Sequence, residues 1–168
     1  MSRMKDDAPR KPPMVDGWLV ADGKFPAEPL ERMVYYARLA PSAFNAQPWK
    51  FVLGKGEIDV FADLERWHAA ADAERRELHV SLGCAIEALR IAADFGGWGT
   101  ELAYFPVQGD ETLVARLSVA FGGPKRDDAA ADLLRHMITR HTSRRAYHAD
   151  AVADLDRKRL YQCFEIGD

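Results

Sequence analysis

Two stretches of the chain carry the hydrophobic spacing of an amphipathic helix. Over residues 29–39 the apolar positions recur at i, i+3, i+4 and i+7: Leu30, Met33, Val34 and Ala37. Pro29 suits the first turn of this helix, and Pro41 stops it. A longer helix is predicted over residues 74–95, because a broad apolar stripe runs along it and Gly96 and Gly97 follow as a terminator.

Four other stretches predict β-strands. Residues 49–53 and 58–61 are apolar runs separated by a Gly-Lys-Gly turn, which is typical of a hairpin. Residues 100–105 and 113–121 follow the long helix, with Gln-Gly-Asp as a turn between them. In the last strand one face is predicted to carry Leu113, Ala115, Leu117, Val119 and Phe121, and the other carries Arg116 and Ser118.

The middle of the long helix is unusually rich in small residues, which are Ser81, Gly83, Cys84, Ala85 and Ala88. Small side chains let another backbone approach closely, although a glycine inside a helix costs about 1 kcal/mol. We therefore expect either a helix of the core or a helix at a dimer interface.

Two further helices are predicted near the end of the chain. Asp127 or Asp128 can cap a helix whose apolar positions are Leu133, Leu134, Met137 and Ile138. Residues 152–164 predict a last helix with three inward residues, Leu155, Cys163 and Phe164. The order is helix, two strands, helix, two strands and two helices, which favours an α+β fold over an alternating parallel α/β sheet.

The length, 168 residues, allows one domain with a sizeable core. Residues 29–168 are predicted to form that domain. Residues 1–28 begin with a basic, proline-containing segment that has no apolar stretch of a secretory signal, and they are predicted to form a mobile arm.

The net charge of -3 and the sequence pI near 6.0 provide no overall field that would gather nucleic acid or an anionic membrane. No apolar run is long enough to predict a membrane span. Cys84 and Cys163 lie far apart, which favours free thiols in a reducing cytoplasm. The histidines have no metal-ligand spacing.

The segment APSAFNAQPW, residues 40–49, is the first candidate site. It joins the first helix to the first strand and carries three hydrogen-bonding side chains, Ser42, Asn45 and Gln47. Hydroxyl and amide groups offer both donors and acceptors to a ligand, while proline and aromatic rings offer flat apolar surface. The alternative is an ordinary loop whose polar side chains satisfy its own backbone.

A basic cluster forms the second candidate site, with Arg140, Thr142 and Arg144 as its main members. Guanidinium groups with a hydroxyl between them can bind a phosphate. The alternative is a solvated helix end, where cations interact favourably with the helix dipole.

The first candidate segment resembles the A-P-S-x-x-N-x-Q-P-W pattern of the nitroreductase superfamily. Three further stretches are similar to the Acg-like branch of that superfamily: Arg76–Ala85, Tyr104–Pro106 and Arg140–Arg144. The resemblance covers about residues 30–152. It implies a nitroreductase-like fold with a mixed or antiparallel sheet, a long central helix and an intertwined homodimer. It also implies that Ser42, Asn45 and Gln47 contact the flavin ring of FMN.

The order of the motifs departs from that of a single-lobed nitroreductase. There a basic R-x-[ST]-x-R element precedes the loop motif and holds the FMN phosphate, whereas here Arg140, Thr142 and Arg144 follow the motif. This order resembles the front lobe of the longer Acg-like proteins. It implies a flavin site that is either incomplete or completed by a second subunit.

The resemblance implies an FMN-dependent oxidoreductase that passes electrons from NAD(P)H to a small nitroaromatic or quinone-like acceptor, with no side chain acting as a nucleophile. Two alternatives stay open: a protein that binds and sequesters FMN without efficient turnover, and a dimer that holds no cofactor.

Overall fold

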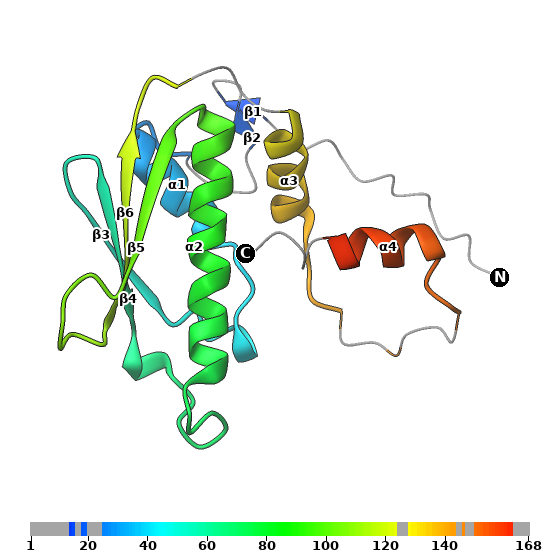
Figure 1. Ribbon diagram of the computed structural model, residues 1–168, viewed down its shortest axis with the longest axis horizontal. Helices are drawn as coiled ribbons and strands as arrows, with labels where there is room; N and C mark the ends of the chain where they lie inside the picture. The colour runs from blue at the N-terminus through cyan, green and yellow to red at the C-terminus, as the bar shows by residue number, and fades with distance from the viewer. Residues whose placement is uncertain are drawn as a thin grey trace.

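The computed structural model describes residues 14–15, 18–19, 25–123, 128–143, 146 and 150–162. The described chain forms an antiparallel sheet with helices against one face (Figure 1). The four helices in these residues are α1 (Pro29–Ala37), α2 (Arg76–Gly96), α3 (Asp128–Thr139) and α4 (Asp154–Gln162). The strands of the sheet are β3 (Trp49–Leu53), β4 (Glu57–Ala62), β5 (Gly99–Tyr104) and β6 (Leu113–Ala120). The predicted α+β class and order of elements are therefore confirmed.

The sheet has the strand order β3-β4-β6-β5, and every neighbouring pair is antiparallel. Two hairpins, β3–β4 and β5–β6, meet at the central β4–β6 pair. There Ile58 lies opposite Leu117, and Val60 lies opposite Ala115. Because alternate residues of a strand share a face, these four side chains point to the same side of the sheet.

That side of the sheet packs against α2, which runs the length of the fold beside it (Figure 1). The helix buries apolar residues on much of its circumference: Leu78, Leu82, Ala85, Ile86, Ala88, Leu89, Ala92, Ala93 and Phe95. α1 and α3 also contact α2, so the sheet and both of these helices pack against the same helix. Burying each large apolar side chain stabilises the fold by about 1.5–3 kcal/mol.

The opposite side of the sheet is polar at its centre and has no described helix over it (Figure 1). Arg116 on β6 donates two hydrogen bonds to Asp59 on β4, at 2.7 and 2.8 Å. The hydrogen bond from Arg116 lowers the pKa of Asp59, and the same contact raises the pKa of Arg116. This paired charge keeps the open face of the sheet hydrophilic.

Three predicted helix boundaries differ from the structure. α1 ends at Ala37 rather than at residue 39. α2 begins at Arg76 rather than at residue 74, because the Asp72 carboxylate accepts hydrogen bonds from the N–H groups of its first turn, Glu77 and Leu78. The last helix begins at Asp154 rather than at residue 152, and its described part extends to Gln162.

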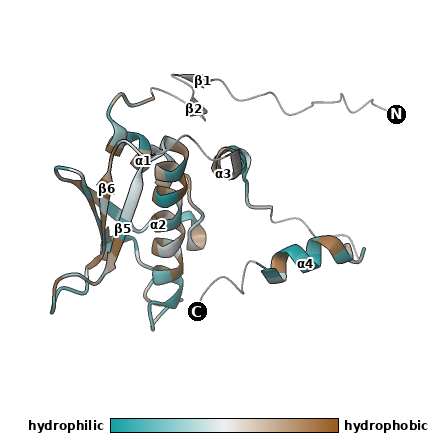
Figure 2. Ribbon diagram, turned by 45° about the horizontal axis from the view of Figure 1, so that its top comes forward, coloured by the Kyte–Doolittle hydropathy of each residue, from teal (hydrophilic) through white to brown (hydrophobic). Residues whose placement is uncertain are grey.

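Leu155, which was predicted to point inward, is exposed because α4 stands apart from the sheet and buries no residue (Figure 2). Phe121, predicted on the apolar face of the last strand, lies beyond the end of β6 with half of its surface exposed, and its ring meets the Trp98 ring edge to face at 5.3 Å. Leu133, one of the predicted apolar positions of the third helix, is also half exposed. Cys163, Phe164 and the possible cap Asp127 lie outside the described residues.

Part of residues 1–28, the segment predicted as a mobile arm, makes contacts with the rest of the fold. β1 (Met14–Val15) and β2 (Trp18–Leu19) pair as a short antiparallel ladder, and β2 lies next to α3. The ring of Phe25 packs edge-on against Tyr35 and Tyr36 of α1. The mobility of residues 1–28 stays a prediction. No helix in the described part of the chain is long and apolar enough to cross a membrane.

We expect Leu82→Ala to lower the free energy of unfolding by about 3 kcal/mol, because deleting a buried leucine leaves a cavity at the centre of the fold. Leu82 is fully buried, whereas Val107, in the loop between β5 and β6, is 45% exposed. Val107→Ala is the control and should change stability by less than about 0.5 kcal/mol. Urea unfolding measures both, and equal effects would contradict the packing described for α2.

Candidate functional site

The loop of residues 40–49 joins α1 to β3, as predicted, and its backbone is strained. Phe44, Asn45 and Gln47 have positive φ angles of 53°, 58° and 51°. The left-handed region is disfavoured by about 1–2 kcal/mol for most L-residues, although asparagine tolerates it better. Strain of this kind persists where neighbouring groups hold the backbone, and it occurs often at binding sites.

Two serine hydroxyls hold the loop. The Ser42 Oγ accepts a hydrogen bond from the backbone N–H of Gln47 at 3.0 Å. The Ser81 Oγ accepts one from the backbone N–H of Ala43 at 3.1 Å and donates to the carbonyl of Glu77 at 2.7 Å. Ser81 is only 2% exposed and belongs to α2. The loop is therefore attached directly to the central helix.

The three predicted ring-contacting residues have different surroundings. The Ser42 hydroxyl accepts a hydrogen bond from the loop's own backbone, as expected if residues 40–49 are an ordinary loop. The same hydroxyl can still donate a hydrogen bond to a ligand. The side-chain amides of Asn45 and Gln47 contact each other weakly, at 3.4 Å. Asn45 is exposed and Gln47 is half-buried. Both amides therefore retain donors and acceptors for a ligand.

A cavity of about 360 Å³ opens beside this loop. One side is formed by the loop, the other by residues 66–72, and the floor by the first turns of α2, including Leu78 and Ser81. Three rings line it: Phe44, Trp67 and His68. This volume lies at the small end of the range of ligand pockets, roughly 300–1,000 Å³. A cavity of this size can hold a small flat aromatic molecule.

The wall opposite the loop is fixed by Asp72. The indole N–H of Trp67 donates to the backbone carbonyl of Asp72 at 3.0 Å. The Asp72 carboxylate in turn accepts from the N–H groups of Glu77 at 3.1 Å and Leu78 at 2.9 Å. Burial raises the pKa of the Asp72 carboxyl, but the hydrogen bonds from Leu78 and Glu77 outweigh this effect, so its pKa lies below the ordinary 3.8. Asp72 thus stays ionised at neutral pH.

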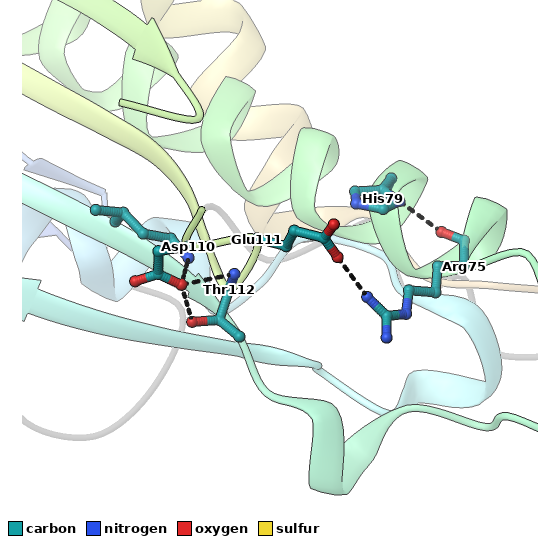
Figure 3. A network of polar contacts seen from close by, with 6 residues as sticks. Arg75, His79, Asp110, Glu111 and Thr112 are labelled. Atoms are coloured by element: carbon teal, nitrogen blue, oxygen red, sulfur yellow. Dashed lines mark hydrogen bonds and ion pairs between the residues drawn. The ribbon is translucent and has the colours of Figure 1, made fainter. Parts of the chain in front are cut away.

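Arg75 connects this wall to the loop between β5 and β6. Its guanidinium carbon lies 5.0 Å from the centre of the Trp67 ring, and its Nη1 lies 3.3 Å from a carboxylate oxygen of Glu111 (Figure 3). In the same view Nδ1 of His79 lies 2.8 Å from the Arg75 carbonyl. Because Glu111 is exposed, its ion pair contributes little stability and mainly orients the arginine.

The structure brings the basic cluster to the start of the loop. Arg140 donates to the carbonyl of Leu39, the residue before the loop, at 3.3 Å and to the hydroxyl of Thr142 at 3.2 Å. The contact with Leu39 joins residues 101 positions apart in the sequence. Arg144 lies outside the described residues. Of the three predicted phosphate-binding residues, Arg140 therefore contacts the chain just after α1, and Thr142 contacts Arg140.

The small residues of α2 do not share one face. Ser81, Ala85 and Ala88 are buried within the chain, whereas Gly83 is exposed and Cys84 is half-buried. A Cβ at Gly83 would meet no heavy atom within 4 Å among the described residues outside its own stretch of helix. The first group serves the core, and only the second is open to a partner.

Sequence reasoning missed three residues of the cavity. Ser81 was noted only as a small residue, although a lone hydroxyl inside the apolar stripe of α2 was a usable signal. Trp67 and His68 lie in a segment without regular periodicity, and only the fold brings them opposite residues 43–48.

The chain is similar in sequence to several curated proteins. A Mycobacterium tuberculosis protein named as an NAD(P)H nitroreductase is 30% identical over 135 residues, which are 75% of this chain and 39% of that protein. The Serratia protein PigM, with the same naming, is 26% identical over 142 residues, or 81% of this chain and 39% of that protein. Acg of M. tuberculosis is 27% identical over 88 residues, or 52% of this chain and 27% of that protein.

No protein-family model matches the chain. Among solved structures, a Clostridium acetobutylicum protein named as an NADH oxidase aligns with a TM-score of 0.46 and 18% identity, over 62% of this chain and 81% of that one.

The structure is that of an α+β protein with a cavity beside the loop between its first helix and its sheet. Over the part of each relative that the chain covers, the sequence similarities support membership of the nitroreductase-like superfamily. It spans 39% of the length of the first two relatives.

We expect Asp72→Asn to lower the urea midpoint at pH 7. Because the folded-state pKa of Asp72 is depressed, its carboxylate contributes stability that is present above the unfolded-state value and is lost as pH falls through the folded-state value. The difference between the wild type and Asp72→Asn should therefore shrink below about pH 4. A difference that stays constant from pH 7 to pH 3 would contradict this role.

Proposed function

We propose that this chain supports an FMN-dependent oxidoreductase activity, in which electrons pass from NAD(P)H to a small acceptor such as a nitroaromatic or a quinone. The observation that carries the proposal is the strained polar loop held beside an aromatic cavity. The names of the relatives, NAD(P)H nitroreductases, support the same reaction class. A cytoplasmic location, where NAD(P)H is available, accompanies the proposal.

The loop supplies groups that suit the polar edge of a flavin ring. Ser42 has a donor, and the amides of Asn45 and Gln47 have donors and acceptors. When bound, the flavin supplies the hydride and electron transfer chemistry. The side chains bind and orient it, and none has to act as a nucleophile.

Arg140, Thr142 and Arg144 are proposed to hold the FMN phosphate. Neither Arg140 nor Thr142 lines the cavity. Arg140 lies beside Leu39, where the loop begins, and donates to the hydroxyl of Thr142. Arginine and a hydroxyl are well suited to a phosphate, because guanidinium groups form paired charge-assisted hydrogen bonds.

A homodimer, intertwined as in relatives of this superfamily, is part of the proposal. α2 presents Val80, Gly83 and the partly exposed Cys84 on the side that no described element covers. A second subunit at this helix would complete a flavin site to which one chain contributes only part. The sequestering alternative differs by binding FMN without steady-state oxidation of NAD(P)H, and the cofactor-free alternative by not binding FMN.

Titration with FMN and with riboflavin, followed by flavin fluorescence, tests the two halves of the site separately. We expect Arg140→Gln to weaken FMN binding about tenfold or more and to leave riboflavin unchanged, because only FMN carries the phosphate. Asn45→Ala should weaken the binding of FMN and the binding of riboflavin by about the same factor. This factor should be smaller than the effect of Arg140→Gln on FMN. Arg135→Gln, an exposed arginine of α3, is the control. If wild-type protein binds neither ligand, the proposed function fails.

We expect Gly83→Leu to fold but to lose the dimer. A Cβ at Gly83 meets no atom within 4 Å among the described residues outside its own stretch of helix, and leucine favours a helix more than glycine does by about 0.8 kcal/mol. Light scattering after size exclusion measures the mass, and Gln108→Leu, in the β5–β6 loop, controls for an added exposed leucine. A variant with the unchanged mass of a dimer would refute the part of the proposal that concerns α2.

A further inference from the structure

Phe44 adopts a backbone conformation that its residue type disfavours, and it gains no burial from it. Its φ and ψ are 53° and 15°, yet 65% of its surface stays exposed. A bulky side chain in the left-handed region is a steric outlier. Packing within the chain therefore does not explain why an aromatic residue stands at this position.

The residues around Phe44 are held on both sides. Before it, the N–H of Ala43 donates to the buried hydroxyl of Ser81 at 3.1 Å. After it, the N–H of Asn45 donates to the carbonyl of Ser42 at 3.0 Å, and that of Ala46 to the carbonyl of Ala43 at 2.9 Å. The backbone is thus shaped before any ligand arrives, and the Phe44 ring is presented at the cavity.

The ring faces an aromatic wall that is also held in place. The rings of Phe44 and His68 meet edge to face, with centroids 5.1 Å apart and planes at 72°. Trp67 lines the same cavity, and its indole N–H is bound to the carbonyl of Asp72. Aromatic rings attract a further ring in offset or edge-to-face arrangements. The cavity therefore offers a flat molecule aromatic contacts from two separate segments.

We propose that Phe44 is a specificity-determining residue of this cavity, where its ring selects a flat aromatic molecule by packing against it opposite the Trp67 segment. This inference rests on the proposed function in one respect, which is that the flat molecule bound in the cavity is the electron acceptor. Binding of the ring itself needs no flavin. The exposed Phe44 side chain, rather than the loop's polar groups, then sets which acceptor fits.

Calorimetric titration of the flavin-free protein with para-nitrobenzyl alcohol tests this assignment. We expect Phe44→Ala to raise the Kd about five- to tenfold and Phe44→Tyr to keep it near the wild-type value, because tyrosine preserves the ring. Phe105→Ala is a matched control. Phe105 also has a positive φ, of 46°, is half exposed and contacts a histidine ring, that of His79, but it does not line the cavity.

Thermal unfolding separates this role from a structural one. We expect Phe44→Gly to keep or raise the melting temperature while weakening probe binding, because glycine adopts the left-handed conformation without strain. A fall in melting temperature as large as that of Leu82→Ala would overturn the inference.

Three binding results would also overturn the inference: no binding of the probe to the wild type, equal losses in Phe44→Ala and Phe105→Ala, or displacement of the probe by FMN. Probe binding without FMN binding would instead leave the assignment of Phe44 intact and remove the proposed enzyme function.

Discussion

The packing of α2 against the sheet is the interaction on which the rest of the molecule depends. The helix is buried on several sides at once, by the sheet, by α1 and by α3, so its position sets theirs. The same helix carries Ser81, whose hydroxyl reaches out of the apolar stripe to the loop of residues 40–49. At its first turn, Asp72 satisfies N–H groups that would otherwise be unpaired and also fixes the Trp67 wall. Core packing and cavity shape are therefore determined by one element.

Local spacing was sufficient to predict the elements but not their ends. The stripe of α2 and the alternation of β6 follow from helical and strand periods, and both elements were found. The start of α2 depends on a carboxylate four residues earlier in the chain, which periodicity does not register. Leu155 was predicted to point inward because it is apolar, yet it is exposed on α4. Whether an apolar residue is buried depends on a partner from elsewhere in the fold.

The candidate site also has some features that the sequence predicts and others that depend on the fold. Residue types made Ser42, Asn45 and Gln47 a candidate binding loop but left an ordinary loop as the alternative, and the resemblance to the nitroreductase motif favoured binding. The left-handed backbone of the loop and its attachment to Ser81 required the structure. The approach of Arg140 to Leu39 spans 101 positions and has no local signature at all. The contribution of each predicted residue to flavin binding stays a prediction.

The pairing of β4 with β6 has a consequence for how the chain reaches its fold. Each hairpin, β3–β4 and β5–β6, closes a short connection and can form early. Joining β4 to β6 instead closes a loop that contains all of α2, with the larger loss of chain entropy that a longer loop brings. Contacts of such long sequence separation slow folding. We therefore infer that the collapse of α2 onto the two hairpins, rather than either hairpin itself, limits the rate at which the cavity comes into existence.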